Sequence, residues 1–164
     1  MANRIYFANQ QVAIRQDEDG LSDAWTVVHG VQSVAVTTTF NLEQAFELGQ
    51  LAIYENIEGV PDIEVSMTKV LDGYPLLYVL ATFAGSLVWT PSGGATVSPT
   101  LAGRSNAKIG VAVGIWPDTK DFAEGTPTTQ MEMSGMFVSS IGYNFPLEDN
   151  FTEDITLVGN DKAW

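Results

Sequence analysis

Residues 62–70 read Asp-Ile-Glu-Val-Ser-Met-Thr-Lys-Val and form the clearest strand pattern in the chain. Successive side chains of a β-strand point to opposite faces, so Ile63, Val65 and Met67 would share one face and the polar residues between them the other. The Asp72-Gly73 pair that follows favours a turn. This stretch therefore predicts a strand with one buried face and one polar face.

Similar patterns predict strands along most of the chain. Val12 and Ile14 alternate with other residues over positions 11–15. Residues 25–40 are rich in Val, Thr and aromatics, which suits a strand, and Gly30 predicts a bend or bulge within it. Further strands are expected at residues 109–115, 131–136, 137–145 and 151–158. The first of these has Gly or Ala at every second position, which predicts close approach by another layer.

One short helix is expected over residues 75–82. Asp72 can serve as its N-cap, or Pro75 can occupy its first turn, where the missing N–H costs nothing. The leucines at 76, 77 and 80 would form its buried stripe. Residues 42–54 are ambiguous, because helix formers there are interrupted by Gly49. We interpret them as the end of a strand followed by a projecting loop that runs to Pro61.

A second loop is expected over residues 91–103, which are rich in Gly, Ser, Thr and Pro. The sum is an all-β, mainly antiparallel fold of roughly seven to nine strands with one short helix. A two-sheet β-sandwich and a partly closed barrel both fit this pattern. No repeat or linker divides the sequence, so we interpret residues 1–164 as one domain.

The net charge of the chain limits the classes of partner that it can bind. It carries 20 acidic and 7 basic residues, a net charge of −13, and the basic residues are scattered singly. A protein that binds nucleic acid or an anionic membrane surface needs a basic patch, so both classes are disfavoured. There is no cysteine, which excludes disulfides and thiolate metal sites. We expect neither a secretory signal nor a membrane span, because the longest apolar run is far below the ~20 residues that a span requires.

No cluster of residues has the composition of a catalytic apparatus, and no cofactor is expected. His29 is the single histidine and has no nucleophile motif beside it, so we interpret it as structural. The acidic turn at residues 17–20 lacks the rest of a calcium loop and is either solvated or a weak cation contact. One acidic group could be read as the acid and base of a glycosidase, but a negatively charged loop is favoured: Glu55, Glu58, Asp62 and Glu64. The tryptophans could be read as a sugar-binding platform, but core and subunit contacts are favoured: Trp25, Trp89, Trp116 and Trp164.

Three stretches, at residues 46–65, 69–78 and 145–160, resemble bacteriophage tail tube proteins. The first two run FELGQLAIYENIEGVPDIEV and KVLDGYPLLY, and the third runs FPLEDNFTEDITLVGN. The order of projecting loop, strand, turn, short helix and final strand is that of the family. The chain ends at Trp164, soon after the last expected strand, where we would expect more sequence in such relatives.

The resemblance implies a virion structural protein, not an enzyme, made in the host cytoplasm and carried in the tail. Such subunits form hexameric rings that stack into a hollow tube, through which DNA passes without specific binding. Other tail proteins, namely sheath or tape measure and baseplate, would be its partners. Six copies would bring a formal charge of about −78 to each ring, which would repel DNA phosphates from an acidic lumen.

Contacts within and between rings would use free strand edges and the loops near residues 50–61 and 91–103. The candidate assembly residues are Gln50, Tyr54, Glu55, Asn56, Glu58, Pro61, Trp89 and Arg104. Two alternatives stay open: a tail-completion or baseplate protein of the same fold, and a β module that binds carbohydrate or a host surface. The second alternative would expose a cluster of aromatic residues on one face and would not need to self-assemble.

Overall fold

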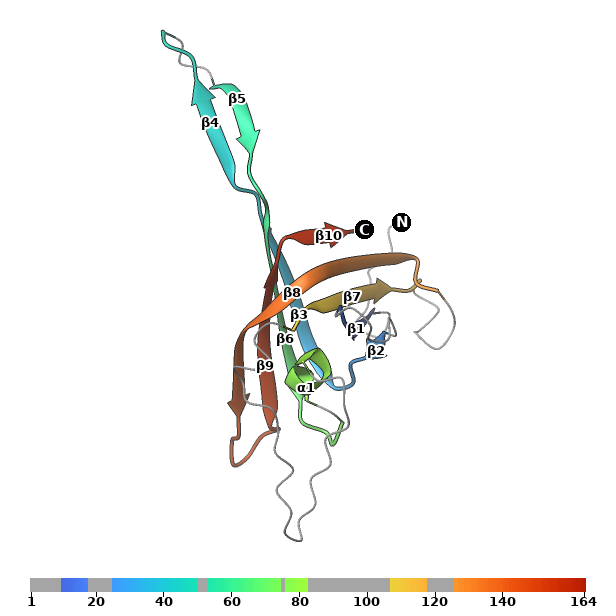
Figure 1. Cartoon of the computed structure of the whole chain (residues 1–164). Helices are drawn as coiled ribbons and strands as arrows, with labels where there is room; N and C mark the ends of the chain where they lie inside the picture. Colours follow the sequence, from blue (N-terminus) through green and yellow to red (C-terminus); the bar gives the residue numbers. More distant parts are fainter. Residues whose placement is uncertain (1–9, 18–24, 50–52, 75, 83–106, 118–125) are drawn as a thin grey trace.

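The computed structural model describes residues 10–17, 25–49, 53–74, 76–82, 107–117 and 126–164. Antiparallel strands make up most of this part of the chain, with one helix near its middle (Figure 1). In chain order the elements are β1 (Gln10–Gln16), β2 (Thr26–Val27), β3 (Val31–Thr39), β4 (Leu42–Phe46), β5 (Ile53–Glu58), β6 (Asp62–Val70), α1 (Leu77–Thr82), β7 (Ile109–Ile115), β8 (Thr129–Asn144), β9 (Thr152–Gly159) and β10 (Asp161–Ala163).

Two sheets share the long strand β8. Its first half pairs with β7 on one edge and with β10 on the other, in a sheet ordered β10-β8-β7-β1-β2. Its second half pairs with β9, in a sheet ordered β8-β9-β6-β3. The strand curves from one sheet into the other (Figure 1). The described strands do not close into a barrel, so the two-sheet prediction is confirmed over the barrel alternative.

The prediction of separate strands at residues 131–136 and 137–145 is wrong, because both belong to β8. Gly135, near the middle of the strand, has a φ of 60°, which an L side chain rarely adopts. The ladder also shifts register between Val138 and Ser140. A strand with such irregularities bends instead of ending, and this lets one segment serve two sheets.

The core lies between the two sheets. Val65, Met67, Ile155 and Leu157 point inward from one sheet, and the side chains of β1 and β7 meet them from the other. The buried faces predicted for residues 11–15 and 62–70 are therefore confirmed. Each fully buried aliphatic side chain contributes about 1.5–3 kcal/mol relative to an exposed one.

The small residues of β7 have close neighbours, but these come from the adjacent strand β1 and from the residue after β7, not from another layer as predicted. A Cβ added to Gly110 would stand 2.9 Å from the side chain of Arg15, and one added to Gly114 would stand 2.7 Å from the ring of Trp116. Arg15 pairs with Asp17 and Glu132 and lies over the ring of Trp25. The second face of β7 is thus closed by side chains from β1 and from the end of β7.

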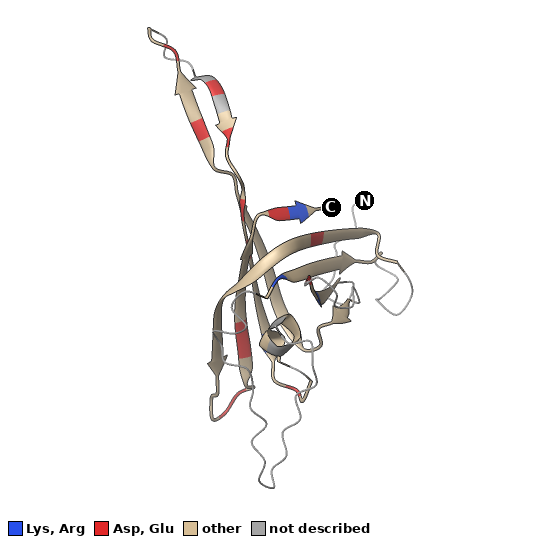
Figure 2. Cartoon of the chain, viewed as in Figure 1, with Lys and Arg blue, Asp and Glu red and all other residues tan. Residues whose placement is uncertain are grey.

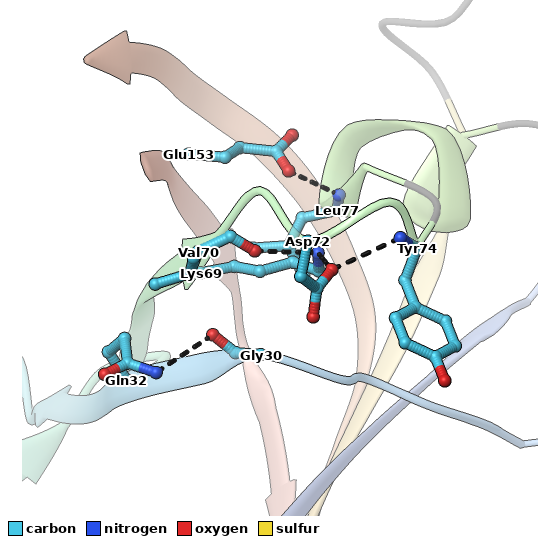
Figure 3. Close-up of polar contacts among 8 residues, drawn as sticks. All are labelled: Gly30, Gln32, Lys69, Val70, Asp72, Tyr74, Leu77 and Glu153. Carbon is cyan, nitrogen blue, oxygen red and sulfur yellow. Dashed lines mark hydrogen bonds and ion pairs between the residues drawn. The ribbon is translucent and has the colours of Figure 1, made fainter. Parts of the chain in front are cut away.

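The predicted helix is confirmed as α1, but Asp72 is not its N-cap. The alternative start at Pro75 lies outside the described residues. Asp72 accepts the backbone N–H of Tyr74, which precedes the helix. The first helical N–H group, of Leu77, donates instead to the carboxylate of Glu153 at 2.6 Å (Figure 3). The N–H of Tyr78 donates to the other oxygen of the same carboxylate at 3.0 Å. Glu153 is fully buried on β9, and a capping partner so far along the chain leaves no local sequence signal.

Two further polar groups complete this corner. The Tyr143 hydroxyl donates to Glu153, and burial together with the nearby carboxylate raises the pKa of Tyr143 far above its ordinary range. Lys69 has a fully buried side chain whose Nζ donates to the Val70 carbonyl and to Asp72 (Figure 3). Its hydrogen bond lowers the pKa of Asp72. Because the folded pKa is lowered, the contribution to stability is present above the unfolded pKa near 4 and is lost as the pH falls through the folded pKa.

Replacing Glu153 by Gln should lower the free energy of unfolding by about 1–3 kcal/mol, because the Leu77 and Tyr78 N–H groups each donate to a different carboxylate oxygen and one of these acceptors becomes an NH2 donor. Urea unfolding measures this change. Glu64→Gln, on the exposed face of β6, is the matched control and should change stability by less than about 0.5 kcal/mol. Equal midpoints for the two variants would contradict the capping role.

Candidate assembly interface

A two-stranded hairpin of β4 and β5 stands out from the body of the molecule (Figure 1). Leu42 pairs with Glu58, and Ala45 pairs with Glu55, with a register shift near the tip. The prediction of a strand end and a projecting loop up to Pro61 is therefore wrong in its second part. The segment does project, but it does so as an ordered ladder.

The hairpin exposes apolar side chains that nothing in the described chain covers. Leu42, Phe46 and Ile57 are each more than half exposed, and Leu48 near the tip is fully exposed. Glu43 and Glu55 share the hairpin with them, with no Lys or Arg among its described residues (Figure 2). An isolated two-stranded hairpin is marginally stable in water, so a partner surface would stabilise it.

The outward face of the β8-β9-β6-β3 sheet carries carboxylates among Thr and Ser side chains, with Val158 exposed opposite Glu64. β6 places Asp62 and Glu64 on this face, and β9 places Asp154 on the same face farther along, opposite Thr68. Asp154 accepts a hydrogen bond from Thr68, its partner across the ladder. The residues of β3 on the same face are Ser33, Ala35, Thr37 and Thr39. Lys69 belongs to the opposite, buried face, so no basic side chain of these four strands interrupts the acidic surface.

This sheet has two edges without a strand partner in the described chain. β3 pairs only with β6, and Phe137–Asn144 of β8 pair only with β9. Each edge presents a row of backbone N–H and C=O groups. Such edges are templates for pairing with another chain.

The turn between β8 and β9 exposes a second apolar cluster, at the opposite end from the hairpin tip (Figure 1). Phe145 stacks on Tyr143 at 6.2 Å and meets Phe151 edge-on at 5.2 Å. All three rings are at least two-fifths exposed, and Leu147 in the same turn is fully exposed. The two ends of the molecule are therefore both apolar at their tips.

The structure brings together some of the predicted assembly residues and leaves others out. Glu55 and Glu58 lie exposed on β5. Tyr54 and Asn56 lie on the same strand, and Pro61 follows it at the hairpin base. Gln50, Trp89 and Arg104 lie outside the described residues, as do all of residues 50–52 and 91–103 of the two predicted loops. All eight remain predictions.

Sequence reasoning missed the acidic face and the aromatic turn. The alternation that identified the buried residues of β6 also marks Glu64 as outward, so that signal was available. Nothing in the local sequence pairs Phe145 with Phe151, because their contact depends on the turn geometry.

The residues considered for chemistry have structural surroundings. His29 lies in a turn, not within a strand as predicted, and stacks on Tyr74 at 4.4 Å. Asp17 bonds Arg15 and the Gly135 N–H, while the rest of the acidic turn lies outside the described residues. In the part of the chain that the structure describes, no three His, Asp or Glu groups are placed to hold a metal, and no helix is long and apolar enough to cross a membrane.

No protein-family model and no curated protein matches the chain. Solved structures do match it over nearly its whole length. A chain of the anti-feeding prophage baseplate, six-fold symmetrised, matches with a TM-score of 0.62 at 9% identity, covering 99% of this chain and 96% of that one. This chain has the fold of tail and injection-system proteins.

Two other matches bear on the fold. A chain of the sheath/tube terminator of an extracellular contractile injection system has a TM-score of 0.60 at 14% identity, covering 99% and 96% of the two chains. The SPP1 tail tube has a TM-score of 0.57 at 8% identity, covering 97% of this chain and 77% of that one. Identities this low show a shared fold only.

Proposed function

We propose that this protein is a non-enzymatic virion structural protein, the subunit of a phage-like tail tube built from stacked hexameric rings. The observation that carries the proposal is the β8-β9-β6-β3 sheet, which combines carboxylates on its outward face with two edges that have no strand partner among the described residues. The fold shared with the SPP1 tail tube supports the same role, and the six-fold symmetry of the anti-feeding prophage baseplate supports the copy number.

Ring closure follows from the two edges. The β3 edge of one copy would pair with the Phe137–Asn144 edge of the next, and repetition around a six-fold axis leaves no edge exposed. The sheets would then form one continuous inner wall. Edge pairing between identical copies also accounts for a chain with only 16% charged residues, since other copies would cover much of its surface.

The outward face of this sheet would line the lumen. Asp62, Glu64 and Asp154 would be repeated in each of the six copies, with Thr and Ser between them. A wall of carboxylates repels phosphates, so DNA can pass without adhering during ejection.

Stacking would use the two apolar ends. The hairpin of one ring would reach the next ring, at the end where Phe145, Leu147 and Phe151 are exposed. Burial of these side chains would supply the hydrophobic driving force. Because the two patches differ, such a contact is head-to-tail and can repeat indefinitely along a tube.

A baseplate or tube-terminating protein of the same fold is the second candidate. The match to the anti-feeding prophage baseplate and the match to the sheath/tube terminator favour it, because proteins in those assemblies share this fold. Both roles use a ring, and they differ in whether the rings stack without limit.

The purified full chain should form rings or tubes, alone or with tail components as nuclei. Analytical ultracentrifugation and negative-stain microscopy test this together. Long uniform tubes support the tube subunit, and single rings support the baseplate or terminator role. A monomer at high protein concentration in the presence of tail components would contradict both.

Charge reversal in the lumen should make the tube retain DNA. Tubes of a Glu64→Lys/Asp154→Lys variant, incubated with short duplex DNA and sedimented, should carry DNA at low salt and release it as salt rises. Glu132→Lys/Asp161→Lys makes the same change in charge on the other sheet and is the control. If the control variant retains as much DNA, the sheet does not line the bore.

Cysteine pairs can locate the stacking contact, since the natural chain has no cysteine. Oxidised tubes of a Leu48→Cys/Leu147→Cys variant should give ladders of linked copies on a denaturing gel, because both positions are fully exposed tips. Leu48→Cys/Lys108→Cys is the control and should give none. Tubes that assemble but do not cross-link at Leu48 and Leu147 would exclude this contact and leave the tube itself standing.

A further inference from the structure

The hairpin leaves the body through a short interruption in the sheet. The β3–β6 ladder ends at the pair Thr39 and Asp62, and the β4–β5 ladder begins at the pair Leu42 and Glu58. Residues 40–41 connect β3 to β4, and residues 59–61 connect β5 to β6. Pro61 is among them and has no N–H to donate. Such a break would ordinarily act as a hinge, since few backbone bonds cross it.

Side-chain amides fill this break. Asn41 donates through Nδ2 to the Val60 carbonyl and to the Asp62 carboxylate, each at 2.9 Å. Asn160 donates through Nδ2 to the Pro61 carbonyl at 2.7 Å and to the other oxygen of Asp62 at 3.4 Å. The Asp62 carboxylate thus accepts an amide from each side. The Val60 and Pro61 carbonyls, which accept no hydrogen bond from either ladder, accept one from these amides instead.

The backbone is also drawn together at this point. The Gly59 N–H donates to the Asn41 carbonyl at 2.7 Å, and a Cβ on Gly59 would stand 2.7 Å from that same oxygen. Only glycine allows the two connecting segments to approach so closely. Asn160 lies at the corner between β9 and β10, so the clamp ties the hairpin to a strand about a hundred residues away in the chain.

We infer that Asn41, Asp62 and Asn160 form a clamp that fixes the direction of the hairpin relative to the body. They are positioning residues, and their consequence for assembly rests on the proposed tube. A hairpin already aimed along the tube axis loses less conformational entropy when it docks on the next ring. The clamp itself is a property of the single chain.

The clamp can be tested in the unassembled full chain with nitroxides on Glu43→Cys and Gln130→Cys, one on the hairpin and one on β8. Pulsed electron paramagnetic resonance should give a single narrow distribution of the distance between the two nitroxides, and this distribution should broaden in an Asn41→Ala/Asn160→Ala variant. Gly59→Ala, which forces the same segments apart, should broaden it too. Gln10→Ala, an exposed amide at the start of β1, is the control, and circular dichroism checks that each variant folds.

A distribution in both clamp variants as narrow as in the control would overturn the inference, whether or not tubes form. Where the parent chain does form tubes, the Asn41→Ala/Asn160→Ala variant should raise the protein concentration needed for tubes by about tenfold, the loss expected for a few exposed hydrogen bonds. An unchanged concentration would show that the fixed direction does not aid stacking. Failure of the parent chain to assemble would count against the proposed function alone.

Discussion

The passage of the single strand β8 through both sheets is the constraint on which the rest of the structure depends. The strand contributes its first half to one sheet and its second half to the other, so the two sheets cannot separate without breaking it. Gly135 and the register shifts absorb the bend, and the core fills the space between the sheets. The buried carboxylate of Glu153 then attaches α1 to this frame through its first N–H groups.

The shared strand also decides which surfaces are left for assembly. Because β8 pairs with β7 over its first half only, its second half becomes an edge, and β3 becomes the other edge of the same sheet. The polar face between these edges carries carboxylates and no basic residue. Unpaired edges, an acidic face and two apolar tips are individually liabilities for a lone domain, and closed rings that stack would cover or use each of them.

The fold was largely predictable because its information is local. Alternation in residues 62–70 and 109–115 identified the buried faces, and the Gly positions of β7 predicted close packing. The failures have non-local causes. The cap of α1 comes from Glu153 on a distant strand. β8 forms one continuous strand because it pairs with β7 in one sheet and with β9 in the other. The hairpin was taken for a loop because its apolar residues have no core to face. Of the interface, the sequence indicated the projecting segment and the sign of the charge, but the edges and the aromatic turn exist only once the strands have paired.

A cryo-electron microscopy map of the assembled particle tests the central claim most directly. The account predicts six copies in a ring, with β3 of each hydrogen-bonded to the second half of β8 of its neighbour and with Glu64 and Asp154 facing the bore. A solitary globule, or a ring whose bore is lined by another surface or mainly by Lys and Arg side chains, would contradict it.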